Sequence, residues 1–216
     1  MSPVRLPRPP TGRKVARTAA ILAVANLPLI RTWMLHFGAT EAELDTALPG
    51  DDVIGPANLE ATRAVSIDAP PEVVWAWLVQ IGQGRGGFYS YDWLENVFGC
   101  EVESADRVDP QWQSLAVGDE VGLHPKVRLT VTELTPEKSL VLHSVAAPGA
   151  PPPPYVFTWA FALRRGRGGT TRLLVRERYG YRRGWSALVA EPTAAVSFLM
   201  TEKMLRGLRS RAEASA

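Results

Sequence analysis

The sequence predicts an α+β fold in which a curved antiparallel β-sheet is wrapped on a long C-terminal helix. Between residues 119 and 181, short segments with alternating apolar and polar side chains follow one another, separated by turn residues, which is typical of antiparallel strands. From residue 184 onward the apolar residues recur at helical spacing instead. One strand and two short helices precede this region, and an extra apolar helix is expected near the N-terminus.

The opening strand of the domain is expected at residues 61–68 and its first helix at residues 71–81. Apolar and polar side chains alternate along the strand, which indicates that one of its faces is buried. A proline pair ends the strand, and Glu72 then stands in the first turn of the helix. A carboxylate at this place interacts favourably with the helix dipole.

A second short helix is expected at residues 91–98. Asp92 at its N-cap and Glu95 three residues later match the capping-box pattern, in which side chains satisfy backbone N–H groups at the start of a helix. We therefore favour helix capping over acid–base catalysis as the role of these two carboxylates.

A glycine-rich connection joins the two helices. Four glycines lie within residues 82–87, and glycine tolerates positive φ and the close approach of other atoms to its backbone. Aromatic residues follow directly, at Phe88, Tyr89, Tyr91 and Trp93. A flexible joint followed by aromatic rings fits the rim of an apolar cavity.

Further strands and the C-terminal helix would supply the walls of this cavity. The strands are expected at residues 119–124, 127–134, 140–145, 155–163 and 170–181. The fourth of them carries Trp159 and Phe161 on one face, and the helix carries Phe198 and Met200. Pro192 makes this segment either two helices or one kinked helix. The alternative to a cavity is that these side chains pack against each other in a solid core.

The composition is that of an ordinary globular protein. The chain has 216 residues, enough for one domain and an extension, of which 46% are hydrophobic and 21% charged, with a net charge of +2. Residues 164–183 hold eight arginines and one acid, a pattern that also occurs on nucleic-acid-binding surfaces. The whole chain, however, contains 20 Arg and only 4 Lys, so arginine is preferred everywhere. We expect no nucleic-acid partner.

Cysteine and histidine usage gives no sign of a metal or cofactor. Cys100 is the only cysteine, so no disulfide can form within the chain, and a buried, inert thiol is expected. His36, His124 and His143 do not share the spacing of metal ligands. We therefore expect neither a metal site nor a cofactor.

Residues 1–60 are expected to form an extension that precedes a domain of residues 61–216. Residues 1–14 are rich in Pro and Arg and are expected to be a disordered basic tail. An apolar helix is expected within residues 18–37. The remainder, residues 38–60, is acidic and contains turn signals, as in a linker.

The apolar segment leaves three interpretations open. It can be a helix that packs on the domain or lies on a membrane surface, a single membrane anchor, or the core of a signal peptide. The apolar run between Arg17 and Arg31 has 13 residues. A spanning helix needs roughly 20. We favour a helix associated with the domain or with a membrane, so the protein is expected to be cytoplasmic or membrane-associated.

Three segments resemble a known superfamily. They are residues 66–75 (SIDAPPEVVW), 87–95 (GFYSYDWLE) and 204–207 (MLRG). Together they resemble the START-like (SRPBCC) superfamily, which has the helix-grip fold and includes polyketide cyclase/dehydrase-like proteins and plant pollen-allergen lipid carriers. The resemblance covers the chain from about Ala61 onward and implies this fold. It does not decide the function, because the superfamily contains carriers, cyclases and proteins of unknown role.

The first hypothesis is a protein that binds a hydrophobic small molecule or lipid in an internal cavity. The rim would consist of Phe88, Tyr89, Tyr91 and Trp93, and the wall of Trp159, Phe161, Phe198 and Met200. Arg176 or Arg178 would meet an anionic head group if their face of the last strand points inward. If that face points outward, both arginines meet solvent.

The second hypothesis is a polyketide cyclase/dehydratase-like enzyme that acts on an apolar substrate in the same cavity. Such an enzyme needs an acid–base pair within hydrogen-bond reach of its substrate. The candidates are Tyr89, Asp92, His124, His143, Arg176 and Glu177. No two of them stand at a diagnostic spacing, so the sequence leaves the reaction, the ligand and the oligomeric state open.

Overall fold

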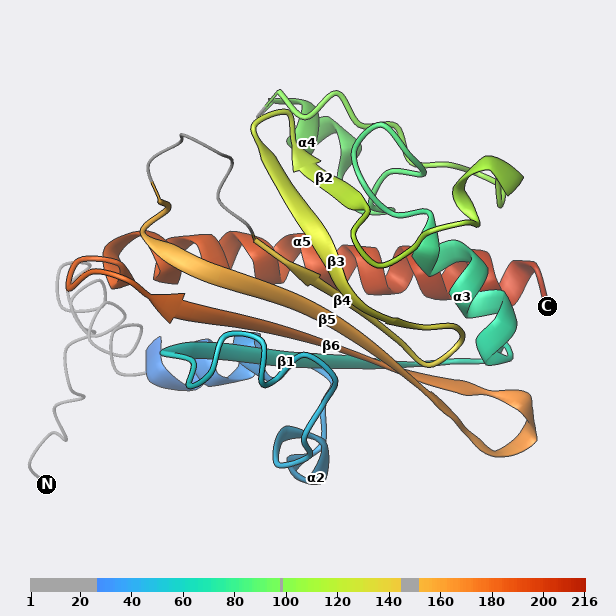
Figure 1. Cartoon of the computed structure of the whole chain (residues 1–216). Helices are drawn as coiled ribbons and strands as arrows, with labels where there is room; N and C mark the ends of the chain where they lie inside the picture. The colour runs from blue at the N-terminus through green and yellow to red at the C-terminus, as the bar shows by residue number, and fades with distance from the viewer. Residues whose placement is uncertain (1–26, 98, 145–151) are drawn as a thin grey trace, which may run out of the picture. The chain divides into compact units, whose positions relative to one another are not determined.

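The computed structural model of the chain describes residues 27–97, 99–144 and 152–216 (Figure 1). The chain divides into two compact units, residues 1–34 and residues 35–216. In the first unit the described residues are helical. The predicted disordered tail and most of the predicted apolar helix lie outside the described residues. No helix in the described part of the chain combines the length and the apolar content that crossing a membrane requires.

The second unit is built on a six-stranded antiparallel sheet with the strand order β1-β6-β5-β4-β3-β2. The strands are β1 (Leu59–Ile67), β2 (Glu120–His124), β3 (Val127–Thr135), β4 (Ser139–His143), β5 (Tyr155–Arg165) and β6 (Thr171–Tyr181). The longest pairing joins β5 and β6, from Tyr155 opposite Tyr181 to Arg165 opposite Thr171. The alternating pattern of the sequence predicted this sheet, and β1 begins at Leu59 rather than at Ala61.

The helix α5 (Ala187–Ala214) lies along one face of this sheet (Figure 1). Phe161 and Leu173 of the sheet share one buried core with Met204 and Leu208 of the helix. Pro192 lies near the start of α5, and the helix continues through it as one element of 28 residues. The predicted α+β fold, a sheet packed on a long C-terminal helix, is confirmed.

Two short helices and the loop between them complete this core. They are α3 (Pro71–Val79) and α4 (Asp92–Val97). Trp77 of α3 is buried in the same core as Leu205 of α5. The loop approaches α5 closely at Gly207, where a Cβ atom would lie only 2.2 Å from the carbonyl oxygen of Tyr89. Glycine at this position is therefore required for the loop to reach the helix.

The acidic segment before β1 covers the face of the sheet opposite α5. It contains the short helix α2 (Glu41–Leu44), and its Leu48 packs with Leu174 of β6 in a small buried cluster. Its acids pair with arginines of β6. Two of the ion pairs are Arg172–Glu43 (2.8 Å) and Arg176–Asp51 (2.7 Å), and Glu60 at the start of β1 adds Arg178–Glu60 (2.9 Å). This segment, predicted as a linker, belongs to the same compact unit as the sheet.

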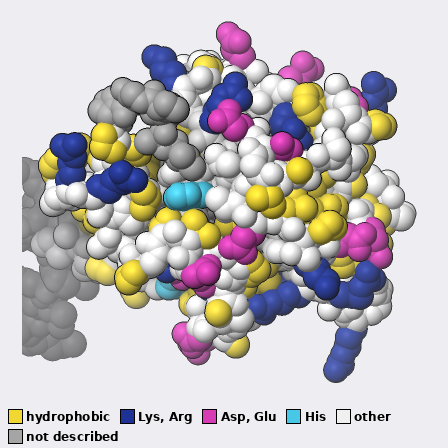
Figure 2. Space-filling model, viewed as in Figure 1, with side chains coloured by type: hydrophobic (Ala, Val, Ile, Leu, Met, Phe, Trp, Pro, Cys, Tyr) yellow, Lys and Arg dark blue, Asp and Glu magenta, His cyan; other side chains and the backbone are white. Residues whose placement is uncertain are grey.

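These ion pairs account for three of the eight arginines in the arginine-rich stretch of residues 164–183. Because side chains alternate along a strand, Arg172, Arg176 and Arg178 lie on one face of β6 and meet the acids there. On the side of the molecule seen in Figure 2, basic and acidic side chains are interspersed. These three arginines therefore serve to attach the acidic segment to the sheet.

We predict that Glu43→Gln lowers the free energy of unfolding at pH 7 by about 1–2 kcal/mol, because the charge-assisted bond to Arg172 is lost. Arg172 lowers the pKa of Glu43 from 4.5 to about 2 in the folded protein. Stabilisation by the ionised carboxylate is therefore present above pH 4.5 and is lost as the pH falls towards 2. Urea unfolding at a series of pH values should show the gap between wild type and variant closing over this range.

Glu41→Gln is the matched control, since Glu41 is an exposed acid of the same short helix. It should change the free energy of unfolding by less than about 0.5 kcal/mol. A gap for Glu43→Gln that is equally large at pH 7 and at pH 3 would contradict the assignment.

Candidate functional site

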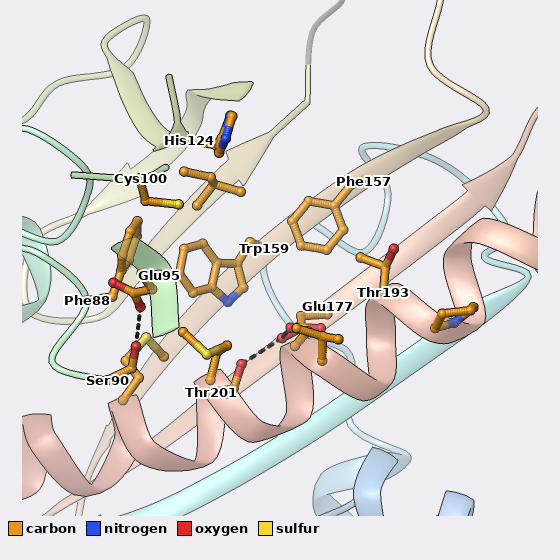
Figure 3. A pocket seen from close by; sticks show the side chains of 16 residues that line it. Phe88, Ser90, Glu95, Cys100, His124, Phe157, Trp159, Glu177, Thr193 and Thr201 are labelled. Carbon is orange, nitrogen blue, oxygen red and sulfur yellow. Dashed lines mark hydrogen bonds between the residues drawn. The ribbon is translucent and has the colours of Figure 1, made fainter. Parts of the chain in front are cut away.

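A cavity of about 580 Å³ lies between α5, the sheet and the segment around α4 (Figure 3). Small-molecule sites have volumes of roughly 300–1,000 Å³. Helix α5 contributes Pro192, Thr193, Val196, Ser197, Met200, Thr201 and Met204, the sheet contributes Leu123, His124, Phe157, Trp159 and Glu177, and the segment around α4 contributes Phe88, Ser90, Glu95 and Cys100. The lining is thus mainly apolar, with a few polar groups among the rings and aliphatic chains.

The structure brings three of the predicted binding residues together in this lining. Phe88 comes from the glycine-rich loop, Trp159 from β5 and Met200 from α5. The rings of Phe88 and Trp159 lie 6.4 Å apart between centroids, which joins the loop to the sheet. Two of the catalytic candidates, His124 and Glu177, also line the cavity.

The other predicted rim residues lie outside the lining. Tyr89 is buried next to α3, where its hydroxyl donates to the carbonyl oxygen of Trp77 at 3.0 Å. Burial raises the pKa of Tyr89 to about 12. Tyr91 and Trp93 form an edge-on ring pair, and Trp93 is 67% exposed. The positive φ of Tyr89 turns the chain here, so that the rings after Phe88 point away from the cavity.

Two predicted wall residues are core residues instead. Phe161 is fully buried, with its ring centroid 4.7 Å from that of Trp159, which itself lines the cavity. Phe198 packs edge-on against Phe37 at 5.8 Å. Phe198 and Met200 are two residues apart, which places them about 200° apart around a helix, so they cannot face the same space.

Arg176 lies on the face of β6 opposite α5. Its guanidinium group donates to the hydroxyl of Thr62 at 2.8 Å and to the carboxylate of Asp51 at 2.7 Å. The predicted meeting of Arg176 with an anionic group in the cavity is therefore corrected, because the alternation along β6 sends Glu177 to the cavity and Arg176 to the acidic segment.

The predicted capping box at the start of α4 is wrong. Both carboxylate oxygens of Asp92 accept hydrogen bonds from Ser104, one from its backbone N–H at 2.8 Å and one from its hydroxyl at 2.6 Å. The backbone N–H of Glu95 donates to the carbonyl oxygen of Tyr91. Asp92 thus anchors the loop that follows α4, and the side chain of Glu95 does not cap the helix.

His143, the remaining catalytic candidate, lies at the end of β4 and outside the lining of the cavity.

Glu177 is held by a buried network. One of its oxygens accepts from Arg63 at 2.8 Å, from Ser197 at 2.7 Å and from Thr201 at 2.9 Å. The other accepts from the hydroxyl of Tyr179 at 3.1 Å, and burial beside this carboxylate raises the pKa of Tyr179. The side chains of Arg63 and Glu177 are 0% and 1% exposed. Both carboxylate oxygens of Glu177 are thus engaged by donors within the protein at the cavity wall.

Glu95 has a different environment. It is buried, and one of its oxygens accepts a hydrogen bond from the hydroxyl of Ser90, while the other, Oε2, has no hydrogen-bond partner among the described residues. Burial raises the pKa of Glu95, and the nearby charge of Asp92 raises it further. Burial likewise raises the pKa of Cys100. Glu95 was not predicted to line the cavity, because its spacing to Asp92 suggested capping.

The sequence of the domain matches a known family model. This model is described as polyketide cyclase / dehydrase and lipid transport, and it matches residues 58–213. The chain belongs to this family. The predicted resemblance to the START-like (SRPBCC) superfamily is thereby confirmed, and with it the helix-grip fold.

Solved structures of proteins from several organisms are similar to this chain, among them the following three. A protein of Nitrosomonas europaea is 19% identical, with a TM-score of 0.46 over 75% of this chain and 100% of that one. A protein of Chromobacterium violaceum is 14% identical, with a TM-score of 0.44 over 71% and 96%. A protein of Mesorhizobium loti is 18% identical, with a TM-score of 0.39 over 68% and 96%. A comparison with curated proteins found no match.

The polyketide cyclase/dehydrase and lipid transport family includes both catalysis and transport in its description, so membership alone does not choose between them. The choice between catalysis and transport depends on the groups that line the cavity. Within residues 27–97, 99–144 and 152–216, no group of three or more His, Cys, Asp or Glu side chains could hold a metal ion. The polar groups of the lining are hydroxyl, carboxyl, imidazole, thiol and indole groups, which can form hydrogen bonds.

We predict that Glu177→Gln lowers the free energy of unfolding by about 3–5 kcal/mol, because it leaves the charge of Arg63 buried without its counter-ion. Urea unfolding followed by tryptophan fluorescence would measure this. The control is Glu120→Gln, which removes an exposed ion pair with Arg128 at 3.7 Å and should cost less than about 1 kcal/mol. Similar losses in the two variants would show that the buried pair does not hold the fold together.

Proposed function

We propose that this chain binds a hydrophobic small molecule or lipid in the cavity beside α5. The observation that carries the proposal is the lining itself, in which Phe88, Phe157, Trp159 and Met200 supply most of the large apolar side chains. Pockets of this volume with apolar walls and few polar groups are typical of small-molecule sites. The description of the family, which includes lipid transport, supports the same conclusion.

The arrangement of α5 supports a binding role as well. Met200 and Met204 stand one turn apart on the helix and both line the cavity. Methionine is flexible and polarizable, so it adapts to apolar ligands of different shapes. The buried carboxylate of Glu177 is neutralised by Arg63, so it does not place an uncompensated charge against an apolar ligand.

Occupation of the cavity is testable with a neutral, apolar dye. Met200→Trp should fill part of the space and weaken the binding of Nile red about tenfold or more, as measured by fluorescence titration. Leu199→Trp is the matched control, because Leu199 is the adjacent residue of α5, is 53% exposed and lies outside the lining. Equal Nile red affinity in wild type, Met200→Trp and Leu199→Trp would remove the cavity from consideration as the binding site.

Native mass spectrometry of protein purified from its own host would identify the natural ligand. A co-purified apolar compound that is present with wild type and Leu199→Trp and absent with Met200→Trp would support the proposal.

A cyclase- or dehydratase-type enzyme is the second candidate, and Glu95 is the observation that favours it. Its carboxyl group lies in the cavity wall, and burial raises its pKa, which is the direction that a general acid requires. The described hydrogen-bond partner of Glu95 is Ser90, which is not a base at neutral pH. His124 also lines the cavity, but its Nδ1 accepts from the backbone N–H of Lys126, so no described hydrogen bond joins Glu95 to a base. Binding without reaction is therefore our first choice.

Comparing the compounds captured by wild type and by Glu95→Gln separates the two functions. If Glu95 protonates a leaving hydroxyl group, the variant should retain the unreacted compound, heavier than the wild-type compound by one water molecule. Mass spectrometry of both preparations measures this difference. Identical compounds in both preparations would favour carriage.

A further inference from the structure

Two polar atoms in the cavity wall have no partner within the described part of the protein. They are the indole nitrogen Nε1 of Trp159 and the carboxyl oxygen Oε2 of Glu95. Both residues line the cavity, and their exposed fractions are only 7% and 6%. Figure 3 shows the indole nitrogen of Trp159 on the side of the ring that faces α5, between the carboxyl groups of Glu95 and Glu177.

Unpaired polar atoms of this kind are uncommon in folded proteins. The large majority of buried polar side-chain atoms have a hydrogen-bond partner, and leaving one without a partner forfeits its interaction with water. An indole N–H can only donate, so it needs an acceptor. A ligand oxygen in the cavity would supply this acceptor.

The remaining polar groups of the lining are engaged within the protein. Ser90 donates to Glu95, and Thr193 donates to the carbonyl oxygen of Val189 at 2.8 Å. Ser197 and Thr201 both donate to Glu177. These hydroxyl groups therefore donate within the protein, and Nδ1 of His124 accepts from the backbone N–H of Lys126 at 3.1 Å. The buried polar atoms of the lining that remain unpaired among the described residues belong to Trp159 and Glu95, so these two groups are placed to recognise the polar part of a ligand.

The charges around the cavity argue against an anionic ligand. None of the described lining residues is Lys or Arg, one is a histidine, His124, and two, Glu95 and Glu177, are acids. The nearest basic partner of Glu177, Arg63, is already paired with it at 2.8 Å. A carboxylate or phosphate in this cavity would lose its hydration without gaining a counter-charge, which is unfavourable.

We propose that the ligand is a neutral apolar molecule that carries a ketone or alcohol oxygen, and that this oxygen accepts hydrogen bonds from Trp159 Nε1 and from the carboxyl group of Glu95. This inference rests on the proposed binding function and specifies the chemical class of the ligand. Burial raises the pKa of Glu95, which agrees with a carboxyl that keeps its proton and donates it in a hydrogen bond.

The test uses three probes with the same ring system and nearly the same size. They are acetylnaphthalene, ethylnaphthalene and naphthoate, substituted at the same ring position, and each is titrated against bound Nile red at neutral pH. Acetylnaphthalene should displace the dye at about 3- to 10-fold lower concentration than ethylnaphthalene, which corresponds to one or two net hydrogen bonds. Naphthoate should be the weakest of the three.

The variants Trp159→Phe and Glu95→Leu remove the two proposed donors while keeping apolar bulk. Each should reduce the preference for the ketone over the hydrocarbon to less than about 2-fold. Trp93→Phe, which changes an exposed ring outside the lining, should keep the wild-type preference. Continued Nile red binding by each variant shows that its cavity is intact.

The outcomes separate this inference from the proposed function. An unchanged ketone preference in both cavity variants, or naphthoate as the strongest probe, would overturn the inference and leave apolar binding in place. If ethylnaphthalene displaced the dye at the same concentration as acetylnaphthalene, the inference would also be overturned and apolar binding would remain in place. Failure of the wild-type protein to bind Nile red or any probe would overturn both.

Discussion

A buried ion pair between Arg63 and Glu177 connects the sheet to the long helix. Arg63 comes from β1 and Glu177 from β6, and the same carboxylate accepts hydrogen bonds from Ser197 and Thr201 of α5. A buried charge is strongly unfavourable without its partner, so any arrangement that separates these elements is penalised. A hydrophobic contact is non-directional, whereas the hydrogen bonds from Ser197 and Thr201 to Glu177 have a defined geometry and so favour this position of α5 over the sheet. Whether such a network adds net stability is a separate matter from the specificity that it provides.

In this position, α5 packs closely at its C-terminal end and borders an open cavity nearer its N-terminus. Towards its C-terminus, Leu205 and Leu208 pack into one core with Trp77 of α3, so that end is filled. Nearer the N-terminus, Met200 faces the cavity rather than a packed neighbour. Gly207 sets the distance to the loop after α3, because a side chain there would collide with Tyr89. Helix α5 is packed at its C-terminal end and held by hydrogen bonds to Glu177 further along. The cavity beside Met200 can therefore stay open.

The sequence pattern placed some residues of the candidate site in the cavity and assigned others to the wrong place. Trp159 and Met200 were predicted in the cavity from apolar stripes, and they do line it. The same stripes included Phe161 and Phe198, which are in the core, because a periodic pattern identifies a buried face but not whether another side chain or open space lies against it. Glu95 was assigned to capping because its spacing to Asp92 fitted. The hydrogen-bond donor to Asp92 is Ser104, twelve residues later, and the donor to Glu95 is Ser90, just before α4. The capping spacing does not indicate either contact.

The local pattern of the sequence was enough to predict the six strands and the helices α3, α4 and α5 in their order. The strands follow from a two-residue alternation, α5 from a helical repeat after residue 184, and the two short helices from the patterns on either side of a glycine-rich loop. These are local properties, since each depends on the period at which a segment presents its apolar side chains. Only the tertiary structure decided which face of β6 meets the helix, that the acidic segment covers the other face, and that a cavity remains beside Trp159 and Glu95. These features depend on contacts between different elements, from Ser197 with Glu177, 20 positions apart, to Arg63 with Glu177, 114 positions apart. The local period of a chain contains no information about such contacts.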